Sequence, residues 1–216
     1  MDVHASEKEQ VEALKKWWKE NGSSVITGLL LGAALLLGGK AWLGYRETQT
    51  LNASTVYSQM MMAQKADSVE VARNQANQLI TTHPGSGYAP LAALMLASQA
   101  VKDGELEAAS TQLQWAIDHA ESSDVLHVAR LRLIQVLIAS GQHDKAAAQL
   151  AAVQQPQAWV YKYRQLEGDL AVATGDTQGA ARAYRESLDS MPEQAPDRAL
   201  LTAKYESVAG MTDPQE

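Results

Sequence analysis

The sequence predicts an all-helical protein in which a single N-terminal transmembrane helix precedes a solenoid of paired helices. Two observations support this prediction. The 19 residues from Asn21 to Gly39 carry no charge, and an apolar run of that length is typical of a membrane span. The later chain is rich in Ala, Leu and Gln at helical spacing, and a glycine turn recurs in it at intervals of 37 and 34 residues.

The composition limits the chemistry that the chain can perform. It has 216 residues, of which 46% are hydrophobic, and this is enough to form a core. It contains no cysteine, so disulfides, a thiolate nucleophile and cysteine-ligated metals are excluded. The first 40 residues carry equal numbers of lysines and acidic residues, so the net charge of −7 belongs to residues 46–216. An acidic domain without a basic stripe is a poor partner for nucleic acid.

The apolar segment has the features of a permanent anchor. At 1.5 Å per residue, Val25 to Tyr45 covers roughly 30 Å, the thickness of a bilayer core. Aromatic residues favour the membrane interface and flank the segment at both ends: Trp17, Trp18, Trp42 and Tyr45. A cleaved signal peptide fits less well because no A-x-A-like site follows the segment. A buried soluble helix would not need tryptophan at both ends. We expect the transmembrane helix at residues 23–45.

The distribution of lysines predicts the orientation. Four lysines precede the span, and at its other end only Lys40, near the edge of the span, and Arg46 are basic. The positive-inside rule therefore places residues 1–22 in the cytoplasm. Residues 46–216 are then on the outer side. Residues 1–22 form either an amphipathic segment, whose lysines contact anionic lipid, or a helical extension of the anchor. The second interpretation includes a helix end near Asn21–Gly22.

Gly28 and Gly32 form a G-x-x-x-G pattern within the span. Small residues four apart let a second helix approach closely, so this face is a candidate contact for a partner helix. Glycine is also common in transmembrane helices generally, so both explanations stay open.

The exported part contains a repeat with a period near 34 residues. Gly104, Gly141 and Gly175 are each followed by an alanine five residues later, and Asp67 takes the equivalent place one period earlier. Helix-turn-helix units of this length are the signature of tetratricopeptide repeats. We expect units at 47–84, 88–121, 124–155 and 157–192, with a capping helix near 197–208.

Helical solenoids bind partners through the groove that the first helices of their units line. The residues six before each turn residue are therefore candidates for the groove: Met61, Ser98, Gln135 and Asp169. Met61 belongs to a run of three methionines. Either this run lies partly in the core, or it forms a surface that adapts to varied apolar partners. The aromatic residues of the later units are more often core than groove contacts.

The sequence offers little support for catalysis. It lacks a Gly-rich phosphate loop, G-x-S-x-G and H-E-x-x-H. The histidines are scattered, and we expect them in loops or facing solvent rather than binding a metal. We predict a protein that is not an enzyme and that holds no cofactor or metal. A hydrolase remains the third hypothesis, which requires a carboxylate or histidine cluster assembled by folding.

The blocks QVEALKKWWKENG, GLLLGAALLLGGKAWLGY, GELEAASTQLQWAI and LEGDLAVATGDTQGAARAYRES resemble the YfgM family. That resemblance implies an ancillary subunit of the bacterial SecYEG translocon, with one inner-membrane span and a periplasmic tetratricopeptide-like domain. It also implies partnership with PpiD, a membrane-anchored periplasmic chaperone, and help to newly exported client proteins. The alternative function is an envelope scaffold that organises cell-wall or division proteins through the groove.

Overall fold

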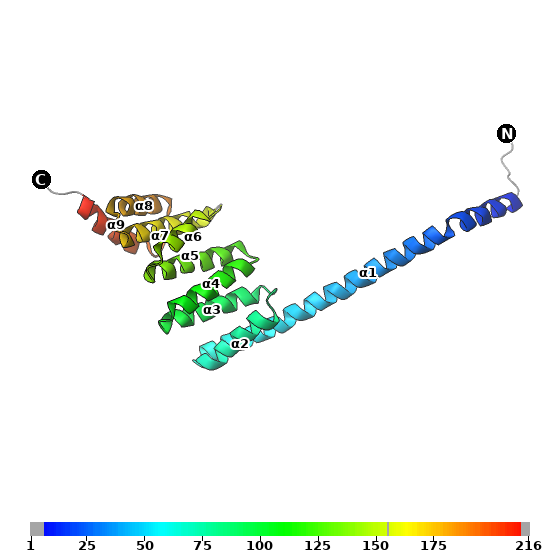
Figure 1. Ribbon diagram of the computed structural model, residues 1–216, viewed down its shortest axis with the longest axis horizontal. Helices are drawn as coiled ribbons and strands as arrows, with labels where there is room; N and C mark the ends of the chain where they lie inside the picture. Colours follow the sequence, from blue (N-terminus) through cyan, green and yellow to red (C-terminus); the bar gives the residue numbers. More distant parts are fainter. Residues whose placement is uncertain (1–6, 155, 213–216) are drawn as a thin grey trace, which may run out of the picture. The chain divides into compact units, whose positions relative to one another are not determined.

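The computed structural model describes residues 7–154 and 156–212, and every regular element in these ranges is helical (Figure 1). The predicted all-helical class is confirmed. The elements are α1 (Glu7–Lys65), α2 (Val69–Thr82), α3 (Tyr88–Lys102), α4 (Leu106–His119), α5 (Ser123–Ala139), α6 (His143–Ala151), the 3₁₀ turn η1 (Gln157–Trp159), α7 (Val160–Ala173), α8 (Thr177–Ser190) and α9 (Arg198–Thr212).

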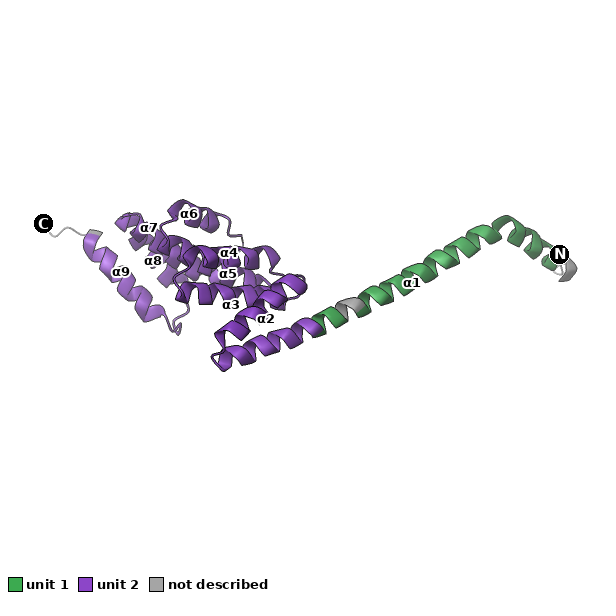
Figure 2. Cartoon of the chain, turned by 60° about the horizontal axis from the view of Figure 1, so that its bottom comes forward, with its two compact units in different colours: residues 1–51 green, residues 52–216 purple. Residues whose placement is uncertain are grey.

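The chain divides into two compact units, residues 1–51 and 52–216 (Figure 2). Helix α1 crosses this boundary, so its last part belongs to the second unit as the first helix of the first pair. The predicted boundaries at residues 22 and 45 are not tested by this division and stay predictions. Within the described residues, α1 is the one helix long and apolar enough to cross a membrane.

Helix α1 continues through Asn21 and Gly22, where one of the two sequence interpretations ended a helix. The Asn21 side chain donates a hydrogen bond to the Trp17 carbonyl oxygen at 3.1 Å, so its polar group is satisfied inside the helix. Gly22 gives room to the Trp18 indole, which lies 3.3 Å from where a Cβ of residue 22 would stand. Both residues therefore fit within a continuous helix.

Each helix pair is joined by the same tight turn. The turn residues are Asp67, Gly104, Gly141 and Gly175, with φ of 56°, 79°, 72° and 84°. Glycine adopts this left-handed conformation without steric cost, which explains its use at three of the four turns. The backbone N–H of the residue after each turn residue donates a hydrogen bond to the carbonyl oxygen five residues before it, as in a Schellman motif. This bond joins Ser68 to Ala63, Glu105 to Ala100, Gln142 to Leu137 and Asp176 to Ala171, at 2.8 to 2.9 Å.

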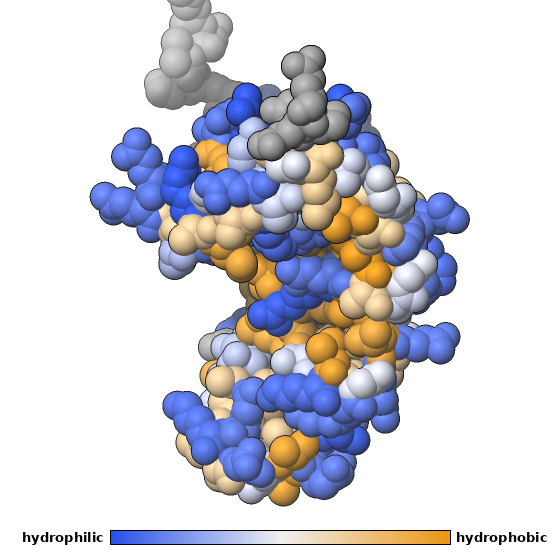
Figure 3. Space-filling view, turned by 90° about the vertical axis from the view of Figure 1, so that its left-hand side faces the viewer, coloured by the Kyte–Doolittle hydropathy of each residue, from blue (hydrophilic) through white to orange (hydrophobic). Residues whose placement is uncertain are grey.

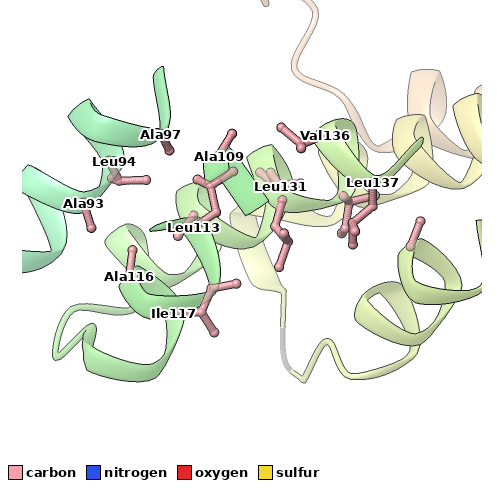
Figure 4. Packing of buried hydrophobic residues seen from close by; sticks show 14 of the residues in the cluster. Ala93, Leu94, Ala97, Ala109, Leu113, Ala116, Ile117, Leu131, Val136 and Leu137 are labelled. Atoms are coloured by element: carbon pink, nitrogen blue, oxygen red, sulfur yellow. The ribbon is translucent and has the colours of Figure 1, made fainter. Parts of the chain in front are cut away.

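The alanine that follows each turn lies at the contact between the paired helices. Ala72, Ala109, Ala146 and Ala180 are 0 to 3% exposed. The largest core cluster extends from α3 to α7, and Figure 4 shows Ala97 of α3 and Ala109 of α4 at the contact of one pair. Separate clusters join the end of α1 to α2 and α3, and α8 to α9. The core therefore continues along the stack instead of gathering at one centre.

Helix α9 packs on the last helix pair. Leu201 and Val208 are buried against the α8 side. Arg198 donates to the carbonyl oxygens of Leu188 and Met191, at 3.1 Å each, and so binds the end of α8. Helix α9 thus removes from water the apolar face that α8 would expose at the end of the stack.

Gly168 of α7 is required by the ring that packs on it. A Cβ at residue 168 would lie 2.3 Å from Cε1 of Tyr184. We expect Gly168→Ala to lower the free energy of unfolding by about 1–2 kcal/mol, because the overpacking cost of about 1–3 kcal/mol exceeds the gain in helix propensity. Thermal unfolding followed by circular dichroism should show a Tm lower by roughly 3–8 °C.

Gly210→Ala in α9 is the matched control, because a Cβ there meets nothing within 4 Å. This control should keep or raise Tm through helix propensity alone. An equal rise in both variants would show that Gly168 is not needed for packing.

Candidate functional site

A groove of about 370 Å³ lies between the second and third helix pairs. We call it the α3–α5 groove. Its lining comes from three helices: Ala97, Ser98, Val101 and Lys102 of α3, Leu106 and Leu113 of α4, and Arg132, Gln135, Val136 and Ala139 of α5. Two of the residues predicted for a binding groove, Ser98 and Gln135, therefore lie in one site.

The walls of the α3–α5 groove are mostly aliphatic. Leu113 is 1% exposed, whereas Val101 keeps 44% of its surface in contact with solvent. The groove therefore offers apolar surface that the core has not covered. Figure 3 shows a hollow with apolar residues between hydrophilic parts of the surface. A concave apolar surface with a few polar groups is the usual form of a binding site.

Two cations lie in the lining of this groove. Lys102 is one helical turn after Ser98, and Arg132 is three residues before Gln135. Neither has a hydrogen-bond or ion-pair partner among the residues that the structure describes. By contrast, the neighbouring carboxylate of Asp103 is engaged, because Arg73 pairs with it at 3.1 Å and Gln99 donates to it at 2.9 Å. The repeat analysis missed both cations, although they share a helix face with the residues it found.

The other two predicted groove residues lie elsewhere. Met61 is half-buried and packs against the cluster of α1, α2 and α3, while Met60 is core at 1% exposure and Met62 is 69% exposed. The run of methionines is therefore divided between core and surface. Nothing here tests a role of Met61 in binding, so that role stays a prediction.

Asp169 is held in a network that joins three helices. Its Oδ1 accepts hydrogen bonds from the Tyr184 hydroxyl at 2.7 Å and from Lys204 Nζ at 2.6 Å. Burial, followed by the hydrogen bond to Asp169, raises the pKa of Tyr184 well above its ordinary value of 10. The hydroxyl therefore stays protonated and donates. This geometry gives Asp169 a role in fixing α9 to α7, and its predicted contact with a partner is untested.

Three of the four predicted membrane residues are exposed within their own unit. Trp17, Trp18 and Trp42 are 48%, 52% and 58% exposed, and the side chain of Tyr45 lies outside the described residues. A Cβ added at Gly28 or Gly32 would meet nothing within 4 Å. The glycine face is therefore open to a second helix, which is a condition for the predicted contact but not a test of it.

The expectation that the histidines face solvent is wrong for His127. This residue is 7% exposed, its Nδ1 lies 2.8 Å from the Tyr163 hydroxyl, and its ring stacks on Trp159. It lines a second cavity of about 520 Å³ with Arg130. Periodicity did not reveal this, because a polar residue on an apolar helix face gives no sign of a partner 36 residues away. No group of three metal-ligating side chains occurs among the described residues.

Burial, and then the charge of Arg130, lower the pKa of His127 below 6.5, whereas Asp124 opposes the shift. The folded state therefore keeps this ring neutral, while the unfolded chain protonates it below about pH 6.5. The stability that His127 contributes is present above that pH and is lost as the pH falls through 6.5 towards the lower folded pKa. We expect Tm to fall less between about pH 7.5 and 5.5 for His127→Gln than for the unmodified chain. Equal pH slopes in thermal unfolding would contradict the assignment.

Comparison with known proteins agrees with this architecture. The sequence pattern of the tetratricopeptide repeat-like domain family matches residues 15–210. No solved structure matches the chain.

Four curated relatives carry the same name, ancillary SecYEG translocon subunit, and three of them illustrate the similarity. The relative from Escherichia coli strain K12 is 31% identical over 88% of this chain and 91% of its own length. That from Haemophilus influenzae is 27% identical over 88% and 92%, and that from Neisseria gonorrhoeae is 30% identical over 96% and 100%. The similarity covers the apolar segment of α1 as well as the repeats. The expectation of a non-catalytic protein agrees with these relatives.

The repeat turns, the open apolar helix and nearly full-length similarity lead to one conclusion: the chain belongs to the YfgM family of tetratricopeptide repeat-like proteins, which includes the ancillary SecYEG translocon subunits.

Proposed function

We propose that this protein is a non-catalytic adaptor of the Sec translocon in the bacterial inner membrane. Residues 1–22 are cytoplasmic, α1 crosses the membrane once, and the helical repeats occupy the periplasm. There the repeats bind a PpiD-like chaperone and assist newly exported proteins. The observation that carries this proposal is the presence, in one chain, of an open apolar helix and an apolar groove, in a family that includes ancillary SecYEG translocon subunits.

The anchor explains how a modest groove can act on exported chains. Tethering a binding site beside the place where its ligand appears raises the effective concentration, to the millimolar range for short connections. A site with weak intrinsic affinity is then occupied often enough to matter. Weak affinity also allows release, which an adaptor that serves many clients requires.

The topology can be tested with reporters fused after Glu216. We expect a reporter that is active only in the periplasm to be active, and a cytoplasm-specific reporter to be silent, because basic residues favour the N-terminal side. Activity of the cytoplasmic reporter would overturn the proposed orientation.

The glycine face of α1 can be tested by adding bulk. We expect Gly28→Leu with Gly32→Leu to reduce recovery of translocon subunits on purification in mild detergent, because large side chains prevent close helix approach. Ala34→Leu with Ala41→Leu is the matched control. These positions lie on the opposite side of α1 at about 100° per residue, and the control should recover normal amounts.

If Gly28→Leu with Gly32→Leu leaves the recovery of translocon subunits unchanged, the glycine face does not take part in the interaction. Loss of recovery in both pairs would instead indicate a general effect of bulk in the span.

Site-specific photocrosslinking separates the adaptor from the scaffold alternative. A photoreactive residue at Ser98 or Gln135, both exposed in the α3–α5 groove, should capture a PpiD-like chaperone and nascent exported chains. The same residue at exposed Glu107 of α4, outside that lining, is the control and should capture much less. Capture of one folded cell-wall or division protein, without nascent chains, would favour the scaffold.

A further inference from the structure

The α3–α5 groove has a chemical character that the proposed function does not specify. Its surface combines aliphatic side chains, exemplified by Val101 and Leu106, with the cations Lys102 and Arg132. An apolar surface alone would accept almost any hydrophobic segment. The two cations make it selective, because a ligand that is itself basic would bring like charges together there.

The charges around the groove are locally unbalanced. The chain carries a net charge of −7, yet Lys102 and Arg132 have no partner among the described residues. Asp103, next to Lys102 in sequence, is occupied by Arg73 and Gln99, and the exposed Glu105 follows in the turn between α3 and α4. Two unpartnered cations in one lining, on an otherwise acidic protein, provide charge complementarity for carboxylates.

Ser98 and Gln135 supply the remaining recognition chemistry. Both are exposed and lie in the same lining from different helices. A hydroxyl and a carboxamide each donate and accept hydrogen bonds, as peptide groups do. Neither has a hydrogen-bond partner within the described parts of the chain. They are suited to an extended backbone, whose N–H and C=O groups are not used internally.

We propose that the α3–α5 groove binds an extended peptide segment in which an apolar side chain is flanked by carboxylates. The apolar side chain lies against Val101, Leu106 and Val136. The carboxylates pair with Lys102 and Arg132, and Gln135 and Ser98 bind the peptide backbone. The volume of about 370 Å³ is within the range of roughly 300–1,000 Å³ usual for ligand sites. This inference rests on the proposed function and defines the class of segment that the adaptor recognises in a protein partner.

The test uses the full-length protein in detergent micelles and three fluorescein-labelled peptides. The first is Gly-Ser-Glu-Leu-Glu-Ser-Gly. The second replaces Glu-Leu-Glu by Lys-Leu-Lys and is basic, and the third replaces it by Glu-Ser-Glu and lacks the apolar side chain. Fluorescence anisotropy should show at least fivefold tighter binding of the Glu-Leu-Glu peptide than of either other peptide. Raising the salt should weaken that binding, because the cations lie near solvent.

Two substitutions examine the two halves of the site. Arg132→Gln should weaken binding of the Glu-Leu-Glu peptide about three- to tenfold, because it removes one of the two cations that pair with the carboxylates. Val101→Ser should weaken Glu-Leu-Glu binding about threefold or more, since it removes apolar surface from the site. Arg182→Gln on α8 is the matched charge control, because Arg182 is exposed and lies outside the groove.

The unfolding temperatures of all variants identify any loss of peptide binding that comes from misfolding. Val101→Ser is expected to fold because residue 101 is 44% exposed. Equal affinity for the acidic and basic peptides, or equal effects of Arg132→Gln and Arg182→Gln, would overturn the inference. Co-purification of translocon subunits in the same experiment keeps the two proposals distinct. If translocon subunits still co-purify while the groove shows no selectivity among the peptides, the inference about the groove fails and the proposed adaptor function stands.

Discussion

The repeat domain depends on close contact between paired helices at four positions. At each position a residue with positive φ ends one helix, and a buried alanine lies five residues later in the next. The tight turn fixes the direction of the second helix, and the small side chain lets the two backbones approach. Because the same device recurs, the first helices of neighbouring pairs come into contact, as α3 does with α5 and α5 with α7.

The α3–α5 groove is a consequence of this stacking. Ser98 and Gln135 are 37 residues apart in sequence and come together only because α3 and α5 occupy equivalent places in successive pairs. The alanines that follow the turns are 0 to 3% exposed, whereas Val101 on the groove side keeps 44% of its surface exposed. The domain is thus well packed between the helices of a pair and keeps apolar surface available at the groove.

The last helix pair adds a second close contact to the turn and alanine that all four pairs share. Tyr184 packs against Gly168, and the hydroxyl of that tyrosine donates to Asp169, which also accepts from Lys204 of α9. A ring that occupies the space of a missing Cβ cannot shift freely, so α8 is locked to α7 and α9 is held across both. Helix α9 thereby covers the apolar face of α8 that the end of the stack would otherwise expose.

The sequence by itself determined the helical class, the positions of the turns and the presence of a candidate membrane span. Each of these depends on local chemistry: φ > 0 at glycine, a small side chain at a fixed spacing, and a long run without charge. The tertiary structure decided which polar residues meet. It buried His127 against Tyr163, used Asp169 to hold α9, and placed Lys102 and Arg132 in the lining of an apolar groove. Such contacts join helices that are distant in sequence, and their geometry follows from how the pairs stack, which a repeat period does not specify.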